Sequence, residues 1–221
     1  MQNFPHDLND PEFANLIRLQ PNLIKKASYI FADAFNDNPL FKILIPDQAE
    51  RKNMLHFLFE YLVTYGVKCG TVLCANKDLD AMAILIPESN VNESFFDQLR
   101  CGGLKILYQF GRNFLTKQAE LGKLVKACHQ NSLEKIGQEH IYLSSLCVHP
   151  SKQGTGLAGI LLNSLIAYSN RQKIPLYLET AKEANLPLYE HFGFKIIDSI
   201  KIPKTEYIIF GLAYQPKNLY Q

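Results

Sequence analysis

Long apolar runs are missing from this sequence, which argues against a membrane-spanning helix. No stretch approaches the roughly 18 consecutive apolar residues that such a helix needs. The first residues, MQNFPHDLNDPEF, contain neither a basic segment nor the apolar segment of a secretory signal. We therefore expect a cytoplasmic protein that is not anchored to a membrane.

Cysteine is sparse and follows no pattern. The five cysteines are odd in number, and none stands in a CxxC or Cys/His spacing suited to a metal or a redox pair. We expect reduced cysteines and no metal site. They are Cys69, Cys74, Cys101, Cys128 and Cys147.

A strong charge of either sign is also missing. The net charge is +2, and no basic run is interleaved with aromatic residues, so the sequence gives no sign of a nucleic-acid partner. With 221 residues, 47% hydrophobic and 20% charged, the chain has the length and composition of one globular domain, residues 1–221.

The most informative segment that is present is 141–169, which joins an apolar strand to an amphipathic helix. IYLSSLCV (141–148) is apolar and β-branched enough for a mostly buried strand, and leucines repeat at helical spacing after residue 157. Gly154 and Gly156 lie between them. The first amides of a helix have no intrahelical partner, and glycines let an anion approach them closely. The segment therefore predicts a phosphate site.

One interpretation of this segment is a dinucleotide site. Gly154, Gly156 and Gly159 match its glycine spacing, and Glu179 stands where a ribose-binding acid is expected. However, the residues from His149 to Gln153 separate the strand from the first glycine, and too few residues follow for a doubly wound sheet. An NAD(P)-binding oxidoreductase is therefore the weaker hypothesis.

The other interpretation uses the spacing Gln153-x-x-Gly156-x-Ala158. This spacing resembles the acyl-CoA site of the GNAT superfamily of N-acetyltransferases. The resemblance continues through the strand LYLET (176–180) to an asparagine, a tyrosine and an aromatic-Gly-Phe turn in the order of that superfamily, and it covers residues 140–214. Those downstream positions are Asn185, Tyr189 and Phe192-Gly193-Phe194.

The resemblance implies an α/β (α+β) fold with a mixed, mostly antiparallel central sheet flanked by helices. Residues 13–87 would supply a strand, helices and a hairpin, and 140–214 the acyl-CoA-binding half. Between them, 88–139 reads as an insert of two or three short helices over one edge of the sheet. Its helix breaks are expected at Gly102-Gly103 and around Gly111 and Gly122.

The insert suggests an acceptor lid. Its aromatic residues would then either face the substrate or simply pack the insert onto the body. These residues are Tyr108, Phe110 and Phe114.

The resemblance also implies acetyl-CoA as cosubstrate, without a metal. Backbone groups of Leu146, Cys147 and Val148 would contact pantetheine, with an amide near Cys147 or Val148 stabilising the oxyanion. Asn185 would contact pantetheine or phosphate, or would only cap a helix. The pyrophosphate would be held by Lys152, Gln153, Gly154, Thr155, Gly156, Leu157 and Ala158.

Two residues are the first candidates for the chemistry. Tyr189 would protonate the leaving thiolate, because a phenol keeps its proton at neutral pH. Glu179 would accept the proton of the amine, with Glu139 or His140 as second choices. Cys147 could carry the acetyl group itself, although no cationic partner stands near it in sequence.

The resulting hypothesis is an N-acetyltransferase that moves an acetyl group from acetyl-CoA directly to a primary amine of a small molecule. The alternative from another class is a catalytically silent acyl-CoA-binding protein of the same fold. The sequence leaves the identity of the amine open, and also whether the chain forms a homodimer.

Overall fold

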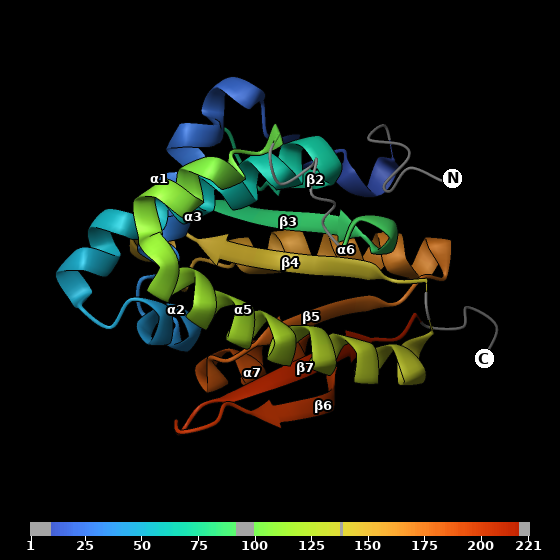
Figure 1. Cartoon of the computed structure of the whole chain (residues 1–221). Helices are drawn as coiled ribbons and strands as arrows, with labels where there is room; N and C mark the ends of the chain where they lie inside the picture. Colours follow the sequence, from blue (N-terminus) through green and yellow to red (C-terminus); the bar gives the residue numbers. More distant parts are fainter. Residues whose placement is uncertain (1–9, 92–99, 138, 217–221) are drawn as a thin grey trace.

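The computed structural model describes residues 10–91, 100–137 and 139–216, which form one seven-stranded sheet with helices on both faces (Figure 1). The strand order is β1-β2-β3-β4-β5-β7-β6, and every neighbouring pair except β4 and β5 is antiparallel. This mixed sheet confirms the predicted fold and is not the doubly wound parallel sheet of a dinucleotide-binding protein. The strands are β1 (Ile17–Arg18), β2 (Thr71–Cys74), β3 (Ala81–Pro87), β4 (Ile141–Val148), β5 (Leu176–Thr180), β6 (Lys195–Lys201) and β7 (Ile208–Tyr214).

The helices divide between the two faces of the sheet. Helices α1, α3 and α5 share one buried cluster, and α6 and α7 share another on the opposite face. In Figure 1, α5 passes in front of the sheet and α6 lies behind it. The helices are α1 (Ile24–Phe35), α2 (Pro39–Leu44), α3 (Gln48–Cys69), α5 (Gly103–Ile136), α6 (Leu157–Gln172) and α7 (Leu186–His191); the 3-10 helices are η1 (Pro11–Phe13), η2 (Pro21–Leu23), η3 (Glu88–Asn90), η4 (Pro150–Lys152) and η5 (Glu183–Asn185).

Local signals explain the amino-terminal half. The side chain of Asp47 accepts a hydrogen bond from the amide of Glu50 and caps α3, as expected for an N-cap aspartate. The buried guanidinium of Arg51 donates to the carbonyls of Asn36, Ile45 and Pro46, so it fixes the chain on both sides of α2. Strands β2 and β3 form the predicted antiparallel hairpin.

Strands β4 and β5 run in parallel but pair only at their beginnings. Ile141 faces Leu176 and Tyr142 faces Tyr177, and no later residues of the two strands pair. On its other edge β4 pairs with β3 along its whole length, with a register shift between Ile84 and Leu85. Such irregularities bend a strand. The carboxyl-terminal parts of β4 and β5 therefore leave the edges that face each other unpaired.

The insert 88–139 is helical in its described part, but its breaks differ from those predicted. Helix α5 bends at Gly111, whose φ is 68°, and continues through Gly122 without interruption. The helix can continue because a single glycine lowers helix propensity by only about 1 kcal/mol. Helix α5 packs against β5, β6 and β7 and against α2 and α3, so it lies across a face of the sheet rather than over one edge.

Candidate active site

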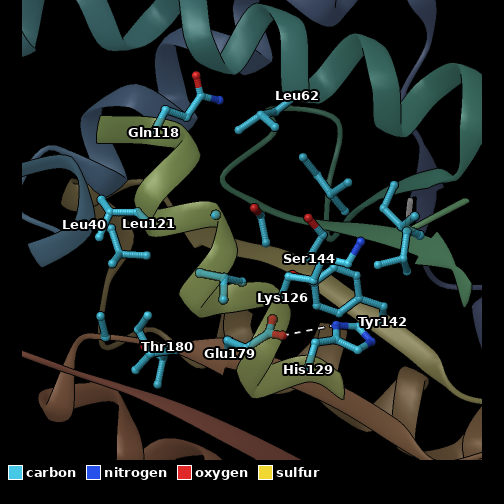
Figure 2. Close-up of a pocket in the computed structure, with 18 of the residues that line it drawn as sticks. Leu40, Leu62, Gln118, Leu121, Lys126, His129, Tyr142, Ser144, Glu179 and Thr180 are labelled. Carbon is cyan, nitrogen blue, oxygen red and sulfur yellow. Dashed lines mark ion pairs between the residues drawn. The ribbon is translucent and has the colours of Figure 1, made fainter. Parts of the chain in front are cut away.

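A cavity of about 850 Å³ lies where α5 faces the diverging ends of β4 and β5. Ser144 and Ser145 of β4 and Glu179 and Thr180 of β5 line its sheet side, and α2 and α3 form the opposite walls (Figure 2). Most of the lining side chains are apolar. Those contributed by α1, α2, α3 and α5 are Phe35, Leu40, Phe41, Leu44, Leu58, Leu62, Leu121, Val125 and Leu133.

Glu179 is buried in this cavity and faces a histidine of the insert. Its Oε1 lies 3.1 Å from Nδ1 of His129, and both side chains are less than a tenth exposed. Although the two atoms are close, Oε1 accepts no hydrogen bond from any residue that the structure describes. His129 in turn places its Nε2 2.9 Å from Nε2 of the buried His140. Figure 2 shows the Glu179–His129 pair beneath Tyr142.

Tyrosine rings enclose this polar group. Burial and the nearby carboxylate of Glu179 raise the pKa of Tyr142 and Tyr177 above the usual value, so both phenols keep their protons. Burial, followed by the charge of Glu179, raises the pKa of Cys128 to about 12. Near neutral pH none of these three groups is charged.

The predicted phosphate turn is exposed and has the backbone that glycine allows. Gly154 and Gly156 have φ values of 78° and 82°, and a Cβ added at either would meet no atom within 4 Å. Gly156 is the N-cap residue of α6, so the first free amides of that helix open onto the same space. Gly159 has a different role, since a Cβ there would lie 3.1 Å from the ring of Phe192.

The other predicted cofactor residues lie at the split in the sheet or beside the turn. Leu146, Cys147 and Val148 pair with β3 on one edge, and on the other edge they pair with no strand among the described residues. Burial raises the pKa of Cys147, which keeps its thiol protonated and argues against an acetyl-carrying thiolate. Asn185 occupies the N-cap position of α7, but its side chain forms no capping hydrogen bond.

Tyr189 lies on the opposite face of the sheet from Glu179. It is buried in the cluster under α6, and its ring meets that of Phe194 edge to face with centroids 5.8 Å apart. Burial raises its pKa to about 12. Among the predicted site residues, only Glu179 lines the cavity. The unpaired ends of β4 and β5 therefore separate the face that carries Glu179 from the face that carries Tyr189.

Several second choices are placed elsewhere. Glu139 is exposed, whereas His140 is buried against His129. Of the insert aromatics, Tyr108 is 89% exposed and Phe114 is buried against Phe110, and none of the three lines the cavity. A lid over the substrate would require these aromatic residues to face the cavity, and they do not.

The sequence reasoning missed His129. Its position in an amphipathic helix was the only signal, and such a position does not show which residues the side chain contacts.

Comparisons with known proteins agree with this fold. The family model of the acetyltransferase (GNAT) domain matches residues 114–196. An uncharacterized N-acetyltransferase of Schizosaccharomyces pombe is 26% identical over 190 residues, which is 85% of this chain and 76% of that protein. A second uncharacterized N-acetyltransferase of the same yeast is 28% identical over 41% of this chain and 39% of its own length.

Solved structures share the fold at low sequence identity. A Corynebacterium glutamicum structure described as histone acetyltransferase HPA2 and related acetyltransferase has a TM-score of 0.64 at 18% identity and covers 94% of this chain and 98% of its own. A polyamine N-acetyltransferase of Drosophila melanogaster, which catalyses the formation of N-acetylagmatine, has a TM-score of 0.59 at 12% identity, covering 90% and 98%. The match to the family model, the two N-acetyltransferase relatives and the shared fold together support a GNAT superfamily acetyltransferase.

Two other features concern the described ranges, residues 10–91, 100–137 and 139–216. No helix there combines the length and the apolar character that a bilayer crossing requires. Nor do those residues include three or more His, Cys, Asp or Glu side chains grouped so that they could hold a metal ion.

Proposed function

We propose that this chain transfers an acetyl group from acetyl-CoA directly to a primary amine of a small molecule. The observation that carries the proposal is the position of Glu179, a buried carboxylate in a large cavity at the point where β4 and β5 separate. A proton acceptor is needed there, because a primary amine is mostly ammonium at neutral pH and cannot attack until it loses a proton.

The turn at Gly154 and Gly156 fits the diphosphate of acetyl-CoA. The space that a Cβ would occupy is open at both glycines, and the free amides at the start of α6 supply donors and a positive dipole end. The exposed Lys152 and Gln153 stand beside the turn, where a cation and an amide can supplement these contacts. The unpaired edge of β4 at Leu146–Val148 can pair with the amide groups of pantetheine as a further strand would.

The two proton transfers of the reaction then take place on opposite faces of the sheet. Acetyl-CoA supplies an activated thioester, so the protein has to orient it, take a proton from the acceptor and return one to sulfur. Glu179 takes the proton on the cavity side. Tyr189, whose pKa of about 12 keeps it protonated, supplies one at its hydroxyl on the α6 side. An amide near Cys147 or Val148 stabilises the oxyanion.

The cavity favours an amine with an apolar body. Its walls are mainly aliphatic and aromatic, while its charged side chains are the carboxylates Glu88, Glu134 and Glu179 together with Lys126 and, when protonated, His129. The excess of carboxylates over lysine suits a cation, and the apolar walls suit the hydrocarbon or aromatic part behind it. Structural neighbours include enzymes described as acting on polyamines and on arylalkylamines. We therefore expect the acceptor to resemble an arylalkylamine more than a polyamine.

A screen of amines tests the proposal. Free-thiol release from acetyl-CoA would be followed with 2-phenylethylamine, a straight-chain monoamine, agmatine and spermidine at equal concentrations. We expect the highest kcat/KM for 2-phenylethylamine or the monoamine. Higher values for agmatine or spermidine would contradict the apolar acceptor. Saturable acetyl-CoA binding without turnover of any amine would favour the catalytically silent acyl-CoA-binding protein.

A further inference from the structure

His129 is held between two polar partners on the sheet. Its Nδ1 lies 3.1 Å from Oε1 of Glu179, and its Nε2 lies 2.9 Å from Nε2 of His140. The rings of Tyr142 and Tyr177 meet it edge to face, with centroids 4.9 and 4.6 Å away. The imidazole therefore has one orientation, in which each ring nitrogen faces one titratable group.

The number of protons in these two contacts is limited. Two ring nitrogens 2.9 Å apart must share a single hydrogen, because two hydrogens would clash and two lone pairs would repel. At the other nitrogen, the buried Oε1 of Glu179 accepts no hydrogen bond from the described residues although Nδ1 of His129 is close. A buried carboxylate oxygen without a donor is costly. Nδ1 of His129 and Oε1 of Glu179 are therefore in close contact with no hydrogen bond between them.

We propose that this contact is filled during the reaction, and that His129 holds the proton which Glu179 takes from the acceptor; the proposal rests on the amine acetyltransferase function above. An N–H bond of the bound ammonium breaks as Glu179 accepts the proton, and an N–H bond forms at Nδ1 of His129. The total charge of the Glu179 carboxylate and the His129 imidazole changes from −1 to 0. The imidazolium then lies between the carboxylate of Glu179 and the ring of His140, which accepts a hydrogen bond from Nε2.

The proton balance of the whole reaction is consistent with this step. An ammonium and a thioester give an amide, a thiol and one free proton. The proton held on His129 is the one released to water after transfer. The second proton lost by the amine nitrogen balances the proton that Tyr189 gives to sulfur. No oxidant, metal or further reactant is needed.

The other titratable groups around the imidazole of His129 do not take up the transferred proton, which stays with Glu179, His129 and His140. Tyr142 and Tyr177 stay protonated because burial and Glu179 raise their pKa values, and the same causes raise that of Cys128 to about 12. Asp198 of β6 influences Cys128 and lies 4.0 Å from the ammonium of Lys135. His140 does not line the cavity, so it is a positioning residue that acts through His129.

The first test needs no substrate. Nitrogen-15 NMR of the histidine rings in the ligand-free protein would show which nitrogens carry hydrogen, with His129→Gln and His140→Gln used to assign the signals. We expect neutral His129 to be protonated at Nε2 and bare at Nδ1 at mildly alkaline pH. Neutral His129 with its hydrogen at Nδ1 would overturn the proposal, because that nitrogen could not then accept a proton.

The second test separates proton removal from structural support. Turnover of the best acceptor in the screen would be compared with that of its β,β-difluorinated analogue, whose amine is less basic and carries a smaller fraction of ammonium. We expect His129→Gln to lower kcat for the ordinary amine by about 10²-fold or more, and kcat for the fluorinated amine several-fold less. The KM for acetyl-CoA should not change. His56→Gln is the matched control, since His56 stacks on Tyr29 and does not line the cavity.

The outcomes are distinguishable from failure of the proposed function. If the wild-type protein acetylates no amine, the function itself is wrong. If the wild-type protein is active and a folded His129→Gln variant loses the same factor with both amines, only the role of His129 is wrong. For His140, Gln keeps a hydrogen-bond acceptor and Leu does not, so His140→Gln should retain more activity than His140→Leu. Equal losses in these two folded variants would remove the positioning role.

Discussion

The two faces of the sheet are built from different kinds of sequence information. On the α6 face, the proposed diphosphate turn is a continuous segment, Gln153–Ala158, which runs directly into the first residues of α6. On the α5 face, the cavity combines residues from α2, α3, α5, β4 and β5, which are far apart in the chain. A site made by neighbouring residues can be recognised from their spacing, whereas an assembled cavity depends on how distant elements pack.

The two sites also differ in how far their residues are exposed to solvent. Gly154 and Gly156 belong to an exposed turn, where backbone conformation decides what can approach. Glu179, His129 and His140 are buried, where each unpaired polar atom carries a cost that packing must offset. The cofactor face should therefore be sensitive mainly to steric and conformational changes, and the acceptor face to the loss of single polar atoms or close contacts.

Removing the hydroxyl of Tyr189 should have the largest effect on the α6 face. Tyr189→Phe keeps the ring that packs on Phe194, so affinity for acetyl-CoA should stay nearly intact. Because a positioned acid contributes about 10²–10⁴ in rate, turnover should fall by that order. With a pKa of about 12, the wild-type phenol keeps its proton at moderately alkaline pH, so Tyr189 should cause no loss of rate there.

Steady-state kinetics and acetyl-CoA titration of the folded variant would check this. Weaker binding with preserved turnover would make Tyr189 a cofactor contact. No change in either quantity would make it a core residue and leave water as the proton donor.

Adding a side chain at the turn should have a smaller effect, confined to the cofactor. Gly156→Val places branched carbons where diphosphate oxygens would approach the amides of α6. We expect the Kd for acetyl-CoA, measured by calorimetry, to rise tenfold or more, which is about 1.4 kcal/mol. Gly137→Val is the matched control, because Gly137 also has a positive φ, 88°, and open space around an added Cβ, but lies outside the turn. Equal affinity in the two folded variants would argue against the turn as the binding site.

Much of the fold could be predicted because its signals are local. Asp47 at the start of α3, the hairpin of β2 and β3, and the strand and helix on either side of the glycine turn each depend on a few neighbouring residues. The short α2 was missed, because six residues are too few to show a helical period. The break predicted at Gly122 was wrong because the tertiary contacts of α5 outweigh the helix propensity of one residue.

The candidate site could be predicted only in part. Glu179 was selected as a strand-end carboxylate, and the structure places it in the cavity. His129 could not be selected, since its partners come from β5 and from the residue before β4. The insert aromatics were considered either as substrate contacts or as packing residues, and the structure places none of them in the cavity, because the bend at Gly111 and the packing of α5 direct the later half of the helix there.

The smallest effect on catalysis should come from a change that acts on the α5 face alone. Gly211 of β7 lies opposite Glu179 of β5, and a Cβ added there would lie 2.8 Å from the hydroxyl of Tyr177, 2.9 Å from that of Ser132 and 3.0 Å from the sulfur of Cys128. Gly211→Ala therefore forces at least one of these side chains to move, and two of them belong to α5 close to His129, whereas the turn is not touched. We expect a loss of about 1–3 kcal/mol in the free energy of unfolding, and a several-fold rise in KM for the amine with little change for acetyl-CoA. Gly122→Ala, in open space on the same helix, should not destabilise the protein. Equal changes in both KM values would mean that the packing of α5 supports the whole sheet rather than the acceptor face alone.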